Sequence, residues 1–121
     1  MGSGQAKEIE NKEGNYFDIK IVVDKKLEPK LLKNGSVQLD ELKEVGREYG
    51  IFEIGFMIGS KVIEIQILEI PEEKFENEEL FEALENFKTI SEGRKKYNVK
   101  SIEIEIYKNN YLEDHKELNF K

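Results

Sequence analysis

The sequence predicts an α+β domain in which four or five antiparallel strands form one sheet and the helices cover one face. Isoleucine alternates with polar residues in Lys61–Ile67 and in Ser101–Tyr107. Successive side chains of a strand point to opposite faces, so these segments predict strands with one apolar and one polar face. The segments between the predicted strands have apolar residues at helical spacing, which predicts helices there. The favoured order is β-α-β-β-α-β, as in the ferredoxin-like fold. The alternative is a different four- or five-stranded antiparallel sheet with one dominant helix.

The chain of 121 residues is long enough for one domain with one hydrophobic core. Residues 1–14 are mostly polar and contain a single branched apolar residue, Ile9. We therefore expect 1–14 to be a flexible N-terminal leader and 15–121 to be a single α+β domain.

Tyr16–Asp24 is the expected first strand, because apolar residues occupy its odd positions. The following segment, residues 25–39, stays open between a hairpin, a loop and the start of a helix. Asn34-Gly35 is a strong signal for a hairpin turn, whereas Ser36 is a suitable N-cap for a helix.

A first helix is expected from Ser36 or Asp40 to Tyr49, where apolar residues recur at helical spacing. Gly50 follows at the position of a left-handed C-terminal cap. Gly46 lies inside this helix, where glycine costs about 1 kcal/mol relative to alanine. Its presence indicates close packing against the sheet.

Two strands, Ile51–Ile58 and Lys61–Ile70, are expected to form a hairpin around the turn Gly59-Ser60. The alternation in the second of these strands changes phase at Leu68. A β-bulge there would keep the apolar residues on both sides of it in the core. The alternative is that Leu68 is an exposed residue at the strand end.

A long helix is expected to begin at Asn77 and to extend to about Lys96, or to end one turn earlier at Gly93. Glu78 and Glu79 match the positive end of its dipole, and the cationic residues 94–96 match the negative end. Its apolar stripe consists of Leu80, Ala83, Leu84, Phe87 and Ile90.

The fourth expected strand, Ser101–Tyr107, is followed by a turn at residues 108–110. Leu118 and Phe120 indicate a further short edge strand near the C-terminus.

The formal net charge of −7 argues against a nucleic acid or an anionic membrane as partner and favours a basic protein. The chain has no cysteine and no apolar run long enough to span a bilayer, so we expect a cytoplasmic protein. No catalytic motif is present, so we expect no enzyme activity and no cofactor. His115 follows Glu113 and Asp114, but adjacent residues rarely converge on one ion, so we expect no metal site.

In the favoured strand order, the polar sides of the strands combine into one surface, which we call the open face. It contains one lysine among acidic and amide residues: Asp18, Lys20, Glu53, Glu64, Gln66, Glu103 and Glu105. Met57 and Tyr107 would add apolar contacts of the kind that anchor interfaces. Two interpretations remain open. The open face is either a solvated surface or the site that binds a basic partner.

In size, charge and architecture, though in no motif, the chain is similar to toxin-immunity proteins and to phage-encoded inhibitors of host defence. That similarity implies a small acidic inhibitor that neutralises a partner protein. The alternative is a ferredoxin-like ligand-binding or regulatory domain that acts as a homo-oligomer.

Overall fold

The structure, a computed structural model, describes residues 14–27, 37–56, 61–92 and 94–120. It is an α+β fold with a six-stranded antiparallel sheet and, within the described residues, two α-helices. In chain order the elements are β1 (Tyr16–Val23), α3 (Val37–Arg47), β2 (Ile51–Phe56), β3 (Val62–Leu68), the 3-10 helix η1 (Glu72–Lys74), α4 (Glu79–Glu85), β4 (Thr89–Glu92), β5 (Lys95–Lys108) and β6 (Tyr111–Asn119).

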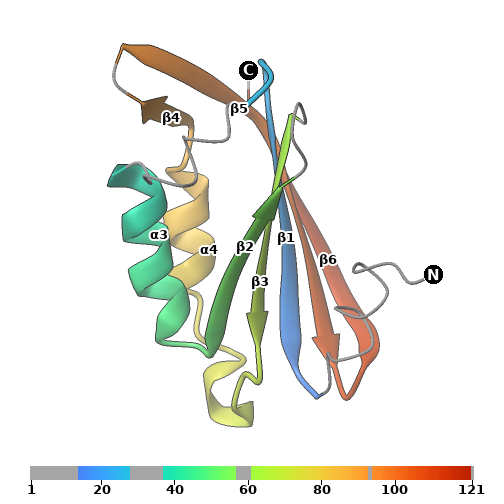
Figure 1. The fold of residues 1–121 in the computed structure, drawn as a ribbon. Helices are drawn as coiled ribbons and strands as arrows, with labels where there is room; N and C mark the ends of the chain where they lie inside the picture. Colours follow the sequence, from blue (N-terminus) through green and yellow to red (C-terminus); the bar gives the residue numbers. More distant parts are fainter. Residues whose placement is uncertain (1–13, 28–36, 57–60, 93, 121) are drawn as a thin grey trace, which may run out of the picture.

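The strands lie in the order β2-β3-β1-β5-β4, and β6 also pairs with β5. The expected neighbours of β1 are present, because it pairs with β3 on one side and β5 on the other. The expected strand count was too low, however. β4 and β6 are additional to the order β-α-β-β-α-β, so the ferredoxin-like order is not confirmed. Both helices lie on the same side of the sheet (Figure 1).

The hydrophobic core lies between this side of the sheet and the helices. The alternating isoleucines point into it as predicted, since Ile65 and Ile102 are fully buried and Ile104 is 1% exposed. Leu39 and Leu42 of α3 and Leu80 and Leu84 of α4 complete the core. Every second side chain of a strand faces this core, so the residues between them lie on the face of the sheet away from the helices.

Helix α3 and its neighbourhood agree with the sequence except at one glycine. Gly46 is buried, and a Cβ atom there would lie 3.3 Å from Cδ1 of Ile67, so the predicted close packing on the sheet is confirmed. Gly50 is not a left-handed cap, because its φ is not positive. A Cβ atom at Gly50 would collide with the backbone oxygen of Leu68. Glycine is required here for close approach of two backbones.

The predicted β-bulge near Leu68 is wrong. Both neighbours of β3 pair with it in unbroken register. The change of phase comes after the strand, where Glu69 adopts a left-handed conformation with φ 56°. This residue turns the chain so that Ile70 returns to the core and is 3% exposed.

The predicted long helix is also wrong beyond its first two turns. Asn77 does lie at its start, where its Oδ1 atom accepts a hydrogen bond from the Glu79 N–H at 2.8 Å. However, α4 ends at Glu85, and the chain continues as the hairpin β4–β5. In that hairpin Ile90 lies opposite Tyr97, and both are buried. Strand pairing therefore buries apolar residues on both sides of the turn.

Strand β5 is twice as long as the predicted Ser101–Tyr107, at 14 residues, and is shared between two pairings. Its first half pairs with β4 and its second half with β1 and β6. Val22 pairs with Ser101 and Val23 pairs with Val99, so Lys100 has no counterpart on β1. This β-bulge lets the strand bend away from the main sheet.

The C-terminal hairpin confirms the predicted turn at residues 108–110. Asn109 and Asn110 have φ values of 54° and 71°, as in the two-residue turn that best fits the twist of paired strands. The predicted short edge strand is present as β6 and is longer than expected, at nine residues.

Four expectations lie outside the described residues: the flexible leader over 1–13, the structure of 28–36, the turn at Gly59-Ser60, and the position of Met57. α3 begins at Val37, close to the helix start expected at Ser36.

Candidate functional site

The open face lies on the side of the sheet opposite the helices and gathers all the described acidic residues that the sequence assigned to it. Two rows of side chains cross the strands. In one row Asp18 lies opposite Gln66 on β3 and Glu105 on β5, and Gln66 in turn lies opposite Glu53 on β2. In the next row Lys20 lies opposite Glu64 and Glu103. The last predicted site residue, Tyr107, lies at the end of the face, whereas Met57 is not among the described residues.

Lys20 is the only cation that the described part of β1, β2, β3 and β5 contributes to these two rows. It is exposed and has a carboxylate-bearing residue directly opposite it on each side, Glu64 and Glu103. Opposite charges across neighbouring strands stabilise a sheet, and like charges destabilise it. One lysine therefore offsets part of the repulsion, and the open face keeps an excess of negative charge.

Strand β6 extends both rows, which the sequence reasoning missed. Glu117 lies opposite Glu103, and His115 lies opposite Glu105. The pairing of Glu103 with Glu117 adds a further like-charge contact. The available signal was the asparagine turn before Tyr111, which predicts a hairpin and hence a strand paired with β5.

A stacked aromatic pair borders the acidic rows. The rings of Tyr16 and Tyr107 are 4.5 Å apart between centroids and inclined by 10°. The Tyr107 hydroxyl donates a hydrogen bond to Oε1 of Glu105 at 3.0 Å. Burial, this hydrogen bond and the nearby negative charges raise the pKa of the Tyr107 phenol to about 12. Tyr107 is therefore a neutral donor over the physiological range, and it orients one carboxylate of the open face.

The chemistry available on the open face is recognition of positive charge. Carboxylates accept hydrogen bonds from lysine and arginine, and the tyrosine pair supplies aromatic contact area. Within the described residues no group of three histidine or acidic side chains is arranged to hold a metal ion. None of the helices in the described ranges is long and apolar enough to span a membrane.

A second charged surface was not predicted from the sequence. Lysine and arginine residues gather at the end of the sheet where β1 ends and β5 begins, and together with one tyrosine they line a hollow. We call this the basic hollow; its lining residues are Lys25, Lys26, Arg94, Lys95, Lys96 and Tyr97. The expected long helix placed residues 94–96 on a helix terminus, which concealed their convergence with Lys25 and Lys26. The sequence signal for this surface was the presence of two cationic runs, residues 25–26 and 94–96, in an otherwise acidic chain.

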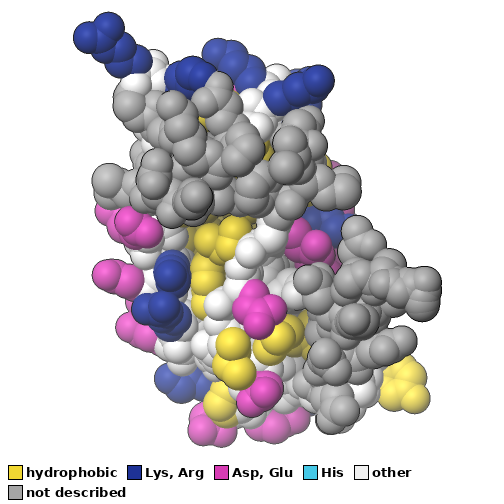
Figure 2. Space-filling view, in the orientation of Figure 1, with side chains coloured by type: hydrophobic (Ala, Val, Ile, Leu, Met, Phe, Trp, Pro, Cys, Tyr) yellow, Lys and Arg dark blue, Asp and Glu magenta, His cyan; other side chains and the backbone are white. Residues whose placement is uncertain are grey.

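Charge is thus distributed unevenly along the molecule. Figure 2 shows several lysine and arginine side chains at the upper end, whereas aspartate and glutamate are more frequent over the middle and lower parts. On this face, therefore, cationic side chains predominate at the upper end and acidic side chains below it.

Known proteins do not identify the function of the open face or of the basic hollow. No protein-family model, no curated protein and no solved structure gives a significant match to this chain.

Proposed function

We propose that this chain is a small inhibitor that binds a basic surface of a partner protein through its open face, as toxin-immunity and anti-defence proteins do. The observation that carries the proposal is the placement of five acidic residues on four adjacent strands, on the side away from both helices. These residues are Asp18, Glu53, Glu64, Glu103 and Glu105. Such a surface attracts a basic partner over long range and speeds its association.

The strands give this surface a fixed geometry. β1 lies between β3 and β5 and is hydrogen-bonded to both, so Asp18 and its neighbours are held on rigid backbone. A preorganised surface loses little conformational entropy when it binds. Tyr107 supplies an aromatic contact beside Glu105, and tyrosine is enriched among residues that contribute most to protein interfaces.

The test compares two charge-reversed variants as immobilised baits for host proteins at low salt. Glu103→Lys/Glu105→Lys reverses two charges of the open face. Glu82→Lys/Glu85→Lys reverses two exposed charges on α4 and is the matched control. We expect a partner that the wild type and the control retain and that the open-face variant loses. With that partner purified, the open-face variant should bind at least about tenfold more weakly.

Two further measurements keep the result interpretable. Glu103→Gln/Glu105→Gln removes the charges without introducing lysine beside Lys20, and circular dichroism checks that each variant is folded. Binding should also weaken as salt rises to about 0.5 M, because ions screen exposed charges. The proposal fails if the two lysine variants retain the same partners with the same affinity.

A second candidate, a regulatory domain of ferredoxin-like type that forms a homo-oligomer, is favoured by the edge strand β2. Ile51 and Ile54 there are 47% and 37% exposed. An apolar edge strand is a ready surface for pairing with a second copy. Light scattering over a concentration series distinguishes the candidates, because an oligomer formed through β2 should dissociate in Ile51→Lys/Ile54→Lys. A wild type that is monomeric at all concentrations excludes this candidate.

A further inference from the structure

The basic hollow is formed by two segments that lie far apart in the sequence. Lys25 and Lys26 follow β1, whereas Arg94 forms the β4–β5 turn and Lys95 and Lys96 begin β5. All five cationic side chains are exposed. The hollow measures about 470 Å³, which is within the range of sites for small ligands.

A clamp between Asp24 and Asn98 holds the two segments together. Oδ1 of Asp24 accepts a hydrogen bond from the Asn98 backbone N–H, and Oδ2 accepts one from its side-chain amide, each at 3.0 Å. The backbone N–H of Asp24 donates to the Asn98 carbonyl, also at 3.0 Å. These three bonds bring the residue before Lys25 against the strand that carries Lys95. The end of β1 is therefore tied to β5 beside the hollow.

The hollow is a local excess of positive charge in a chain of net charge −7. The described residues around it, 24–27 and 94–97, contain five cationic residues and one acidic residue, Asp24. The carboxylate of Asp24 is engaged by Asn98, as described above. Such an excess creates a local positive potential that attracts anions.

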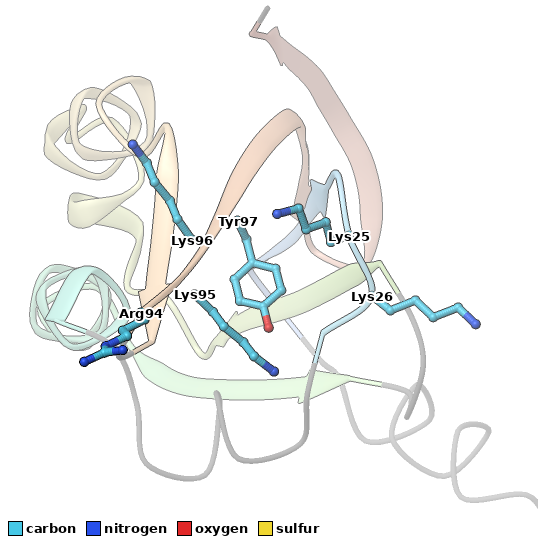
Figure 3. A pocket seen from close by; sticks show the side chains of 6 residues that line it. All are labelled: Lys25, Lys26, Arg94, Lys95, Lys96 and Tyr97. Atoms are coloured by element: carbon cyan, nitrogen blue, oxygen red, sulfur yellow. The ribbon is translucent and has the colours of Figure 1, made fainter.

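Both segments contribute residues that line the hollow. In Figure 3, Lys25 extends from the end of β1 toward Tyr97, whereas the charged ends of Lys26, Arg94 and Lys96 point away from it. Lys95 and Tyr97 are two residues apart on β5, so their side chains leave the strand on the same side. Figure 3 shows the amino group of Lys95 ending near the Tyr97 hydroxyl. The amino groups of Lys25 and Lys95, one from each segment, thus lie on either side of the Tyr97 phenol in this view.

We infer that the basic hollow binds a small ligand that carries several phosphate groups, such as a short inorganic polyphosphate. Lysine ammonium groups bind phosphate as point charges, and the amino groups of Lys25 and Lys95 extend toward this space from the two segments. This site is separate from the open face, so the inference does not depend on the proposed inhibitor function.

The surroundings favour a compact ligand over a nucleic acid. Beyond the hollow the chain is strongly acidic, and it repels a long polyanion. Tyr97 is only 3% exposed, so its ring offers no platform on which a base can stack. A short chain of phosphates fits within the hollow and avoids the acidic remainder.

The test measures binding of three probes by calorimetry at low salt: inorganic tripolyphosphate, adenosine triphosphate and a short single-stranded DNA oligonucleotide. The variant Lys25→Gln/Lys95→Gln removes one cation from each segment. The control, Lys43→Gln/Lys74→Gln, removes the same charge from residues that do not line the hollow. We expect tripolyphosphate and adenosine triphosphate to bind the wild type and the control equally. Binding to the hollow variant should be at least about tenfold weaker, because charged hydrogen bonds are lost.

Three results would overturn the inference. The first is an equal loss of binding in both variants, which would reflect net charge alone. The second is binding of the oligonucleotide with no binding of tripolyphosphate, which would indicate a nucleic-acid surface. The third is salt-sensitive self-association of the wild type that Lys25→Gln/Lys95→Gln abolishes, with no probe bound. That outcome would assign the hollow to the acidic surface of a second copy.

Discussion

The hydroxyl group of Tyr49 accepts a hydrogen bond from the backbone N–H of Leu80 at 2.9 Å. The same hydroxyl donates to the carbonyl of Asn77 at 2.7 Å. A side chain just beyond α3 thus satisfies backbone groups at the start of α4, which would otherwise lack partners. Tyr49 is 2% exposed, so this link between the two helices is inside the molecule.

Tyr49→Phe should therefore destabilise the fold by about 1–3 kcal/mol, because it leaves a buried N–H and a carbonyl without their partner. Urea denaturation measures the change in the free energy of unfolding. Tyr111→Phe is the control, because Tyr111 is 77% exposed, and its effect should stay within about 0.5 kcal/mol. Equal stability of the two variants would contradict a structural role for the Tyr49 hydroxyl.

Gly50→Ala should destabilise the fold by about 1–3 kcal/mol, the usual cost of forcing an extra methyl group into a packed region. The clash is with the backbone oxygen of Leu68, which cannot move aside as the tip of a side chain can. Gly55→Ala is the matched control in β2, because no atom lies within 4 Å of a Cβ built there. Thermal unfolding of both variants tests the contrast, and similar loss in both would show that space at Gly50 is not the cause.

The phenol of Tyr107 should titrate with a pKa of about 12, against 10.0 for an unperturbed phenol, because of burial and Glu105. The protonated form is favoured in the native state. Its contribution to stability is therefore complete below pH 10 and is lost as the pH rises towards about 12. The phenolate absorbance of the wild type minus that of Tyr107→Phe isolates this titration.

Glu105→Gln tests the cause of the shift. We expect the pKa of Tyr107 to fall but to stay above 10.0, because burial remains when the negative charge is removed. Glu82→Gln, on the outer side of α4, should leave it unchanged. A Glu105→Gln variant whose Tyr107 titrates as in the wild type would exclude the carboxylate as a contributor.

The pKa of Asp24 should lie below the ordinary value of 3.8, mainly because the Asn98 side chain donates a hydrogen bond to its carboxylate. A lowered pKa stabilises the native state above pH 3.8, and this contribution is lost as the pH falls through the lowered value. Carbon-detected NMR of the carboxyl group measures the midpoint. Asn98→Ala should raise it, whereas Asn119→Ala on β6 should not. An unchanged midpoint in Asn98→Ala would show that the clamp is not the cause.

The faces of the central strands were predictable from sequence because period-two alternation is a local property. Ile19, Ile65 and Ile104 are buried, and the polar residues between them lie on the opposite side. The acidic rows of the open face follow from this alternation once β1 is placed between β3 and β5. Their extension onto β6 does not, because exposed edge residues such as Glu113 carry no alternation.

The segment after α4 was mispredicted because two patterns coincide there. Phe87 and Ile90 continue the helical spacing of Leu80 and Leu84, although Ile90 belongs to a strand. Ile90 is in a strand because it pairs with Tyr97, which lies beyond the turn. Local spacing in the sequence does not reveal this pairing. The basic hollow escaped prediction for the same reason, because its two segments meet only through this hairpin.

The alternation of buried and exposed side chains along β5 changes phase at Lys100. Before this residue the buried side chains are at odd positions, as at Val99, and after it they are at even positions, as at Ile102. Deletion of Lys100 would bring the two halves of β5 into a single alternation, and every buried side chain of the strand would still face the core. Loss of any one residue between Ile102 and Ile106 would instead turn glutamates into the core. Lys100 is thus the position in β5 at which a residue can be deleted without exchanging the buried and exposed faces of the strand.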